Sequence, residues 1–207
     1  MKDHPTTAFL ILHSFRRCPF AIRVRITLEE KNLSYSLIEE DLSNLSSELL
    51  ELHPEGKVPL LIHSGEVIHE SSIINEYLDE ISGVPYLMPA DPLARAKVRL
   101  WTYWCDQLLK PDLDRFKYEW KSLSESEQEL LKTRIQAHLL KLSQALEKSP
   151  FLMGDQLTLA DIHVFPFYRQ LQKSHPDFSN LFQVSLIDIW LNRVTSRPSF
   201  ERVMRKS

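Results

Sequence analysis

The sequence predicts two domains of different class, an α/β domain followed by an all-α domain. The first part alternates short apolar runs with helical patterns, and it begins with a strand, a helix and a second strand. The second part contains helical patterns and no convincing strand. Between them lies the densest group of helix-breaking residues, Gly83, Pro85, Pro89 and Pro92. We therefore expect an α/β domain over residues 1–82, a linker over 83–91 and a helical domain over 92–207.

The opening strand, helix and strand follow from local signals. An apolar run at residues 8–12 predicts a strand, and Pro19 then opens a helix, because proline fits the first helical turn. We expect this helix to reach Lys31, with Asn32 as its cap. Residues 35–38 predict the second strand. The helical crossover between the two strands predicts that they pair in parallel.

The rest of the α/β domain is predicted to contain a hairpin and one more long helix. A leucine-rich segment over residues 43–52 predicts a short helix or an irregular segment. Pro59 then opens a third strand, and the Ser64-Gly65 turn leads to a fourth. Glu70 begins a helix with an apolar stripe, whose first turn can bind an anion.

Helical patterns account for the second part of the chain. They cover residues 93–110 or further, 125–147, 158–173 and 184–195, with a short helix after Pro198. Thr158 and Asp161 are spaced as a capping box, so we interpret them as structural.

Composition narrows the class of protein. The chain has 207 residues, 25 basic and 28 acidic side chains and a net charge of −3, which gives no indication of a nucleic-acid surface. No apolar run approaches the roughly 20 residues of a membrane span, and the polar start of the chain does not resemble a secretion signal. We expect a cytoplasmic protein without membrane contact. Its eight histidines lack metal-ligand spacing, so we assign no metal.

Cys18 is the candidate for a reactive thiol. It directly precedes Pro19, so it lies at the cap of the predicted helix, where unpaired backbone N–H groups and the helix dipole favour a thiolate. Arg16 and Arg17 add two positive charges beside it. Cys105 lies among aromatic residues on a helix and fits the commoner role of a small buried apolar residue.

These patterns resemble the glutathione transferases, and more narrowly their cysteine-type, omega-like classes. The resemblance spans nearly the whole chain. It is carried by SFRRCPFAIRVR (14–25), KVP (57–59), HESSIINEYLDE (69–80), LMPADPLARAKVRLW (87–101) and GDQLTLADIHVFP (154–166). It implies a thioredoxin-like N-terminal domain, a helical C-terminal domain, and a homodimer that uses glutathione as a cosubstrate.

The resemblance also assigns roles to individual residues. It implies that Cys18 is the nucleophile, that Phe20 flanks it, and that the Val58 backbone pairs with the cysteinyl unit of glutathione beside a cis Pro59. Glu70 and Ser71 match the pair that holds the γ-glutamyl group. Omega-type members often carry a lysine about a dozen residues before this proline, and that lysine is absent here. Lys57 is therefore the candidate residue for binding the glycine carboxylate of glutathione.

Three functions remain open at this point. In the first, Cys18 forms a mixed disulfide with glutathione and reduces a small disulfide or dehydroascorbate-type substrate by a monothiol route, because Ala21 replaces the second cysteine of a CxxC pair. In the second, Ser14 stabilises a glutathione thiolate for conjugation to a small electrophile. In the third, the chain is a non-catalytic interaction protein of the stringent starvation protein A type.

Overall fold

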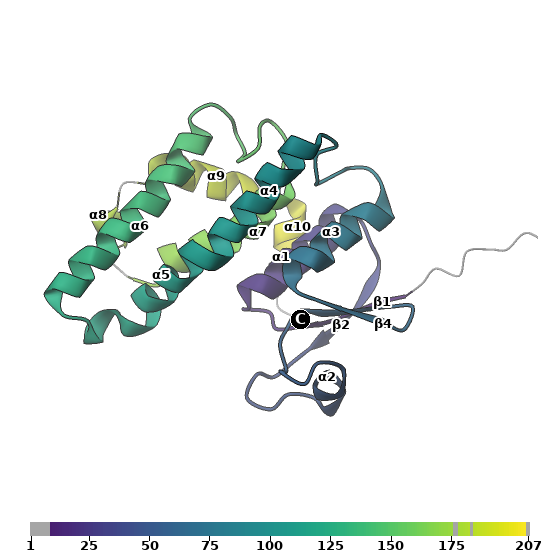
Figure 1. The fold of residues 1–207 in the computed structure, drawn as a ribbon. Coiled ribbons are helices and arrows are strands. Elements are labelled where there is room, and N and C mark those ends of the chain that lie inside the picture. The colour runs from purple at the N-terminus through teal and green to yellow at the C-terminus, as the bar shows by residue number, and fades with distance from the viewer. Residues whose placement is uncertain (1–8, 176–177, 183, 206–207) are drawn as a thin grey trace, which may run out of the picture. The chain divides into compact units, whose positions relative to one another are not determined.

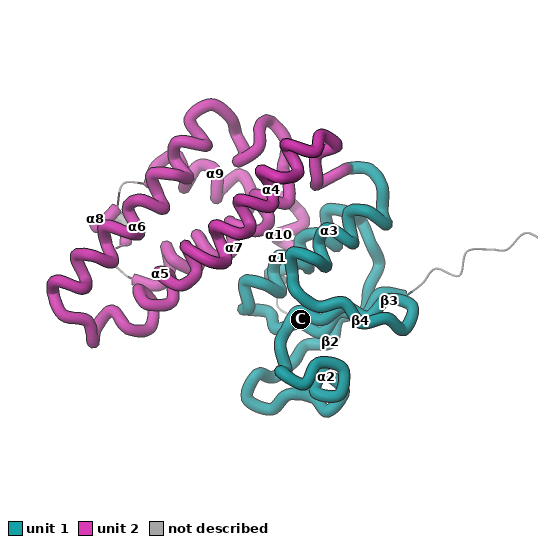
Figure 2. Tube along the Cα trace, in the orientation of Figure 1, with its two compact units in different colours: residues 1–85, 202–207 teal, residues 86–201 magenta. Residues whose placement is uncertain are grey.

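The computed structural model describes residues 9–175, 178–182 and 184–205. The chain divides into two compact units, residues 1–85 with 202–207 and residues 86–201 (Figure 2). The domain bounds expected from the sequence, 1–82 and 92–207 with a linker between them, stay a prediction. Compactness alone does not establish that a segment folds independently.

A four-stranded sheet forms the centre of the first unit. Its strands are β1 (Leu10–Ser14), β2 (Tyr35–Glu39), β3 (Leu60–His63) and β4 (Glu66–His69). They are ordered β2-β1-β3-β4. The pairing of β1 with β2 is parallel, as expected from the crossover, and β3 is antiparallel to both β1 and β4.

Two helices of the first unit cover one face of this sheet, α1 (Pro19–Glu30) and α3 (Ser71–Ser82), whereas the short α2 (Ser47–Leu52) lies on the other side (Figure 1). Their apolar side chains meet those of β1 and β3 in one cluster. The cluster consists of Leu10, Leu12, Val24, Leu28, Leu61, Ile74 and Leu78. Burial of this cluster fixes both helices against the same strands.

Local sequence signals determine where the elements end. Asn32 adopts a left-handed backbone conformation (φ +52°), and the Leu33 amide donates to the Leu28 carbonyl at 3.0 Å, which closes the end of α1 as a Schellman motif. The hairpin between β3 and β4 turns at Ser64 and Gly65, both of which have positive φ. Both features confirm the predictions from the sequence.

The second unit is helical, which confirms the all-α prediction for this part of the chain. Its long helices are α4 (Pro92–Trp104), α6 (Glu125–Leu146), α7 (Leu159–Gln172) and α9 (Ser185–Thr195). Shorter segments are α5 (Lys110–Asp114), α8 (Phe178–Leu181) and α10 (Pro198–Met204), the last of which crosses the division between the units. Within the described ranges, every helix is too short or too polar to cross a bilayer.

The expected helix from residue 93 to 110 or further continues after α4 in several segments of different helical geometry. Two π-helical segments flank α5, η1 (Cys105–Leu109) and η2 (Arg115–Glu119), and a 3₁₀ turn, η3 (Trp120–Ser122), follows. Pro111 explains the first of them. It has no N–H to donate and its ring crowds the carbonyl four residues earlier, so the preceding turn widens.

Asp161 ties the start of α7 to two other segments. Its carboxylate is fully buried and accepts hydrogen bonds from the Thr158 amide (3.0 Å), the Thr158 hydroxyl (3.0 Å), the Leu152 amide (2.8 Å) and the Trp190 indole (2.9 Å). The predicted capping box is therefore present, and Asp161 also holds the preceding loop and α9.

A second carboxylate network joins α2 to the sheet. Glu40 accepts hydrogen bonds from the Ser46 amide and hydroxyl (3.1 and 2.7 Å), and its Oε1 lies 2.6 Å from His13 Nδ1. Burial alone would raise the pKa of Glu40, but these hydrogen bonds outweigh it and lower the pKa below its usual range. Ser46 in turn caps α2 by accepting from the Leu49 amide.

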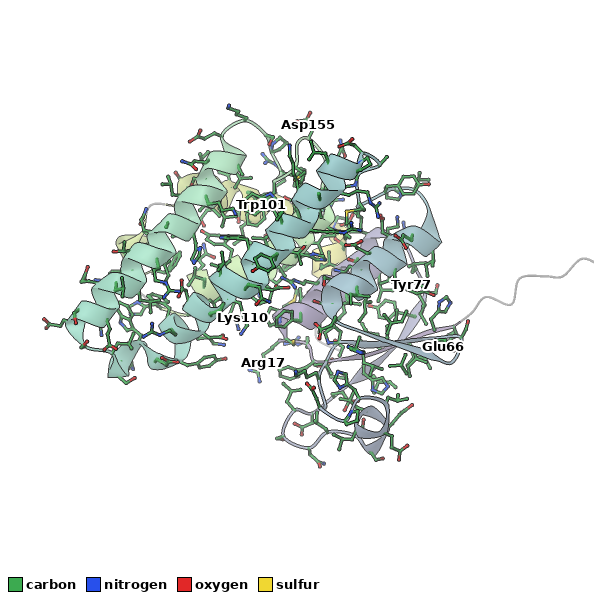
Figure 3. The ribbon with its side chains drawn as sticks, in the orientation of Figure 1. Arg17, Glu66, Tyr77, Trp101, Lys110 and Asp155 are labelled. Carbon is green, nitrogen blue, oxygen red and sulfur yellow. The ribbon has the colours of Figure 1, made fainter. Side chains whose placement is uncertain are left out.

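We predict that Asp161→Asn lowers the free energy of unfolding by more than about 2 kcal/mol, since buried donors lose a charged acceptor. Urea denaturation measures this change. Asp155→Asn is the matched control, because Asp155 is exposed on the loop before α7 (Figure 3) and should change stability by less than about 0.5 kcal/mol. Equal stability of Asp161→Asn and wild type would contradict the structural role of Asp161.

The lowered pKa of Glu40 predicts how stability depends on pH. Because the folded pKa lies below the unfolded one, ionised Glu40 stabilises the fold above about pH 4.3 and loses this effect as pH falls through the folded pKa. Glu40→Gln should therefore cost about 1–2 kcal/mol at pH 7, and the difference from wild type should shrink below pH 4. Exposed Glu51→Gln serves as the control in thermal unfolding at both pH values.

Candidate active site

A pocket of about 470 Å³ lies in the first unit and contains Cys18 and every glutathione-binding residue that the resemblance implies, but not Ser14 of the alternative mechanism. Its lining residues are Cys18, Phe20, Leu42, His53, Gly56, Lys57, Val58, Pro59, His69, Glu70 and Ser71. Three separate segments supply them: the start of α1, the loop that leads into β3, and the junction of β4 with α3. The fold thus gathers residues that are about 50 positions apart in the sequence.

Cys18 occupies the N-cap of α1. Its backbone is extended (φ −73°, ψ 120°), Pro19 takes the first helical position, and the Cys18 carbonyl accepts the first helical hydrogen bond from the Ile22 amide at 2.9 Å. The Cys18 Sγ donates to the Val58 carbonyl at 3.8 Å, so the thiol faces the loop before β3. The side chain is half-buried. Cys18 is thus accessible from the pocket and lies at the positive end of a 12-residue helix.

The start of α3 forms another side of the pocket. Glu70 is its N-cap and has a positive φ of +68°, which is uncommon for a residue with a side chain and is typical of ligand clamps. Ser71 is buried, and its hydroxyl accepts a hydrogen bond from Nη1 of the buried Arg23 at 3.2 Å. The Arg23 guanidinium also lies 5.1 Å from the centre of the Phe20 ring. Arg23 therefore connects the two helix starts that border the pocket.

The loop before β3 supplies backbone groups. The Val58–Pro59 peptide bond is cis. Residue chemistry alone favours the trans form, and the family resemblance implied the cis form. The Val58 carbonyl is the group that faces Cys18.

Lys57 lies at the mouth of the pocket, where it forms an ion pair with Glu55. Each partner favours the charged form of the other, so Glu55 has a lowered pKa and Lys57 a raised one. Both side chains are about two-thirds exposed, and such surface pairs contribute little to stability. A ligand carboxylate can therefore compete with Glu55 for Lys57.

Two histidines of the pocket were not predicted as site residues. His53 and His69 lie edge to face, with ring centres 5.0 Å apart, and both line the pocket. The sequence contained one usable signal, because His69 directly precedes Glu70 and His53 lies four residues before Lys57. Metal-ligand spacing does not detect such a pair. Among the described residues no group of three His, Cys, Asp or Glu side chains is placed to hold a metal.

Ser14 and Cys105 lie elsewhere. Ser14 is the last residue of β1, is fully buried and does not line the pocket. Cys105 is also fully buried, as expected, and its Sγ donates to the His163 carbonyl at 3.6 Å.

The pocket offers complementary groups for a small zwitterionic ligand. The first turns of α1 and α3 both border it, and helix starts attract anions through unpaired N–H groups and the helix dipole. Glu70 offers a negative charge for a cation, and Lys57 offers a positive one. A thiol that lies among these groups can exchange with a disulfide of the bound molecule.

Comparisons with known proteins identify the family of the chain. Residues 12–89 match the family model for the glutathione S-transferase N-terminal domain, and residues 108–198 match the model for the C-terminal domain. A probable glutathione S-transferase, parC of Nicotiana tabacum, is 34% identical over 195 residues, which cover 92% of this chain and 86% of that protein. A stringent starvation protein A homolog of Histophilus somni is 31% identical over 178 residues, 86% of this chain and 82% of that protein.

A solved structure shows the same fold. The tau-class glutathione S-transferase of mango, Mangifera indica, superposes with a TM-score of 0.81 at 26% identity, over 95% of this chain and 93% of that one. The expected thioredoxin-like domain followed by a helical domain is thus confirmed. The omega-like class is not indicated by these relatives and stays a prediction. Both family models and the relatives agree on the broader assignment, and the chain belongs to the glutathione S-transferase family.

Proposed function

We propose that the chain is a glutathione-dependent thiol transferase of the cysteine type, with Cys18 as the nucleophile. The observation that carries this proposal is the location of Cys18 at the N-cap of α1, inside a pocket that also contains Glu70 and Ser71. Cys105, the other cysteine, is fully buried in the second unit.

Glutathione carries one ammonium group, two carboxylates and a thiol, and the pocket contains a counterpart for each. In our proposal Glu70 accepts the ammonium group, and the Ser71 hydroxyl and the first amides of α3 bind the γ-glutamyl carboxylate. The Val58 backbone pairs with the cysteinyl unit. Lys57 binds the glycine carboxylate in competition with Glu55. The sulfur of glutathione is then directed toward Cys18 Sγ, which faces Val58.

The proposed reaction has two thiol–disulfide exchanges. The Cys18 thiolate attacks the glutathione sulfur of a mixed disulfide, an S–S bond forms between Cys18 and glutathione, and the substrate leaves as a thiolate that takes up a proton. A second glutathione thiolate then attacks the glutathione sulfur of this intermediate. Oxidised glutathione is released and the Cys18 thiolate is restored. One free glutathione is therefore consumed for each mixed disulfide reduced, and the other half of the oxidised glutathione comes from the substrate.

The helix N-terminus favours transfer over conjugation. A stabilised thiolate is more abundant but less nucleophilic, and these effects nearly cancel in the attack step. Its advantage is as a leaving group in the second exchange, because a stabilised thiolate departs readily. Conjugation has no such step, since the enzyme thiol never leaves.

The two alternative functions differ in what supports them. Conjugation through Ser14 requires that its hydroxyl reach a glutathione sulfur, and full burial outside the pocket lining argues against this. A non-catalytic role is favoured by the relative named stringent starvation protein A homolog. The accessible Cys18 beside Glu70 and Ser71 argues for catalysis instead. The homodimer and the cytoplasmic location stay predictions.

We predict that Cys18→Ser abolishes reduction of a glutathione mixed disulfide, lowering the rate at least 100-fold, because no mixed disulfide can form. Cys105→Ser and Ser14→Ala are the matched controls and should retain the rate within about threefold. Intact-mass analysis after incubation with oxidised glutathione should show one glutathione, attached to Cys18. Alkylation of Cys18 by iodoacetamide should remain fast at pH 6.5, where an ordinary thiol is mostly protonated.

Other results of these experiments would contradict the proposed thiol transfer and support one of the two alternative functions. A Cys18→Ser variant with unchanged transfer would exclude our proposal, and a simultaneous loss of aryl-halide conjugation in Ser14→Ala would support the serine mechanism. Wild-type protein that neither transfers nor conjugates, and that takes up no glutathione, would favour the non-catalytic role.

We further predict that Glu70→Gln weakens glutathione binding about 10- to 100-fold, because a hydrogen bond between two charged groups contributes roughly 1.5–3 kcal/mol. Titration calorimetry with reduced glutathione measures this. Glu66→Gln in β4 is the control, since Glu66 is exposed and outside the pocket (Figure 3). Equal affinity in both variants would remove Glu70 from the ammonium site.

A further inference from the structure

A second hollow in the first unit, of about 580 Å³, is lined mainly by arginines. Its lining residues are Arg16, Arg25, Tyr35, Leu37, Glu39, Arg202 and Arg205. None of them lines the candidate active site. We call this hollow the arginine pocket. It combines the loop before α1, the middle of α1, strand β2 and the last residues of the described chain.

Arg25 is the least exposed of these arginines. Its side chain lies in α1, is only 5% exposed, and donates from Nη2 to the Val203 carbonyl at 2.7 Å. Its Nε and Nη1 are buried and have no acceptor at hydrogen-bond geometry in the described part of the chain, although the guanidinium group as a whole interacts with the Tyr35 hydroxyl. The Tyr35 hydroxyl lies beside this guanidinium group and Glu29. A buried guanidinium with unused donors is costly unless an acceptor is supplied.

The carboxylates near the pocket have other partners. Glu29 accepts from Arg202 Nε at 2.5 Å, and Glu39 Oε1 accepts the Arg16 backbone amide at 2.6 Å. Four of the lining side chains are positively charged and only Glu39 is negatively charged. The lining therefore carries a net positive charge in a partly enclosed space, which attracts an anion.

We propose that the arginine pocket binds the phosphate group of a small phosphomonoester. Guanidinium groups offer planar pairs of donors that match phosphate oxygens, and several arginines can contact one phosphate. A phosphomonoester carries a charge of about −1.5 to −2 at neutral pH, more than a single carboxylate. Leu37, which is 41% exposed, and the Tyr35 ring provide apolar surface for the organic part of the molecule.

Titration calorimetry of the full chain with phenyl phosphate at 50 mM salt tests the proposal. We expect saturable binding, and we expect the double variant Arg202→Gln/Arg205→Gln to bind at least tenfold more weakly. The fold should tolerate both substitutions, because both positions are exposed. Arg17→Gln is the matched control. Arg17 is an exposed arginine on the loop before α1 (Figure 3) that does not line the arginine pocket, so affinity should change less than twofold.

Three further measurements locate the ligand and define its class. In ¹H–¹⁵N spectra the Nε resonance of Arg25 should shift with phenyl phosphate and be absent in Arg25→Lys. Lys57→Gln, in the candidate active site, should leave affinity unchanged. Inorganic phosphate should bind at least threefold more weakly than phenyl phosphate, and benzoate more weakly still.

The proposal fails if phenyl phosphate shows no saturable binding up to 10 mM. It also fails if Lys57→Gln or Arg17→Gln weakens binding as much as the double variant, since either result would put the anion elsewhere. Equal affinity for benzoate and phenyl phosphate would overturn the phosphate class. These results are independent of thiol transfer, because the two pockets share no residue.

Discussion

The first turns of α1 and α3 present backbone N–H groups that have no acceptor within their own helices, and the candidate active site is built around this constraint. Both helices are fixed against β1 and β3 by one apolar cluster, to which α1 contributes Val24 and Leu28 and α3 contributes Ile74 and Leu78. Because the cluster holds both helices, Cys18 and Ser71 at their N-termini stay on the rim of one pocket. The apolar core therefore determines the electrostatics of the site.

A buried arginine completes this arrangement. Arg23 projects from α1, donates to the Ser71 hydroxyl of α3 and lies against the Phe20 ring. Burying a guanidinium group costs free energy unless its donors and charge find partners. The contacts of Arg23 therefore hold the starts of α1 and α3 in a fixed relation. The positive φ of Glu70 also costs free energy, and such a conformation persists only where the surrounding structure enforces it.

The first unit contains two separate pockets whose charged groups differ. One pocket combines a carboxylate, a lysine and two histidines with helix N-termini, and suits a zwitterion. The arginine pocket contains four guanidinium groups and suits a more highly charged anion. Helix α1 contributes to both, through Cys18 and Phe20 to the first and through Arg25 to the second. The same helix can therefore serve two ligands without sharing a residue between them.

Features that depend on neighbours within a few residues could be read from the sequence. Pro19 fixed the start of α1, Asn32 its end, and the spacing of Thr158 and Asp161 the start of α7, because caps and turns are satisfied by local backbone groups. The position of Cys18 at a cap followed in the same way.

Other features depend on packing between distant segments, which no local pattern encodes. Burial excluded Ser14 from the pocket, folding brought His53 beside His69, and Arg25 reached Val203, 178 positions away. The sequence alone thus determined the caps and the candidate thiol, while the tertiary structure decided which polar side chains share a pocket, since burial and long-range contacts arise only when the chain packs.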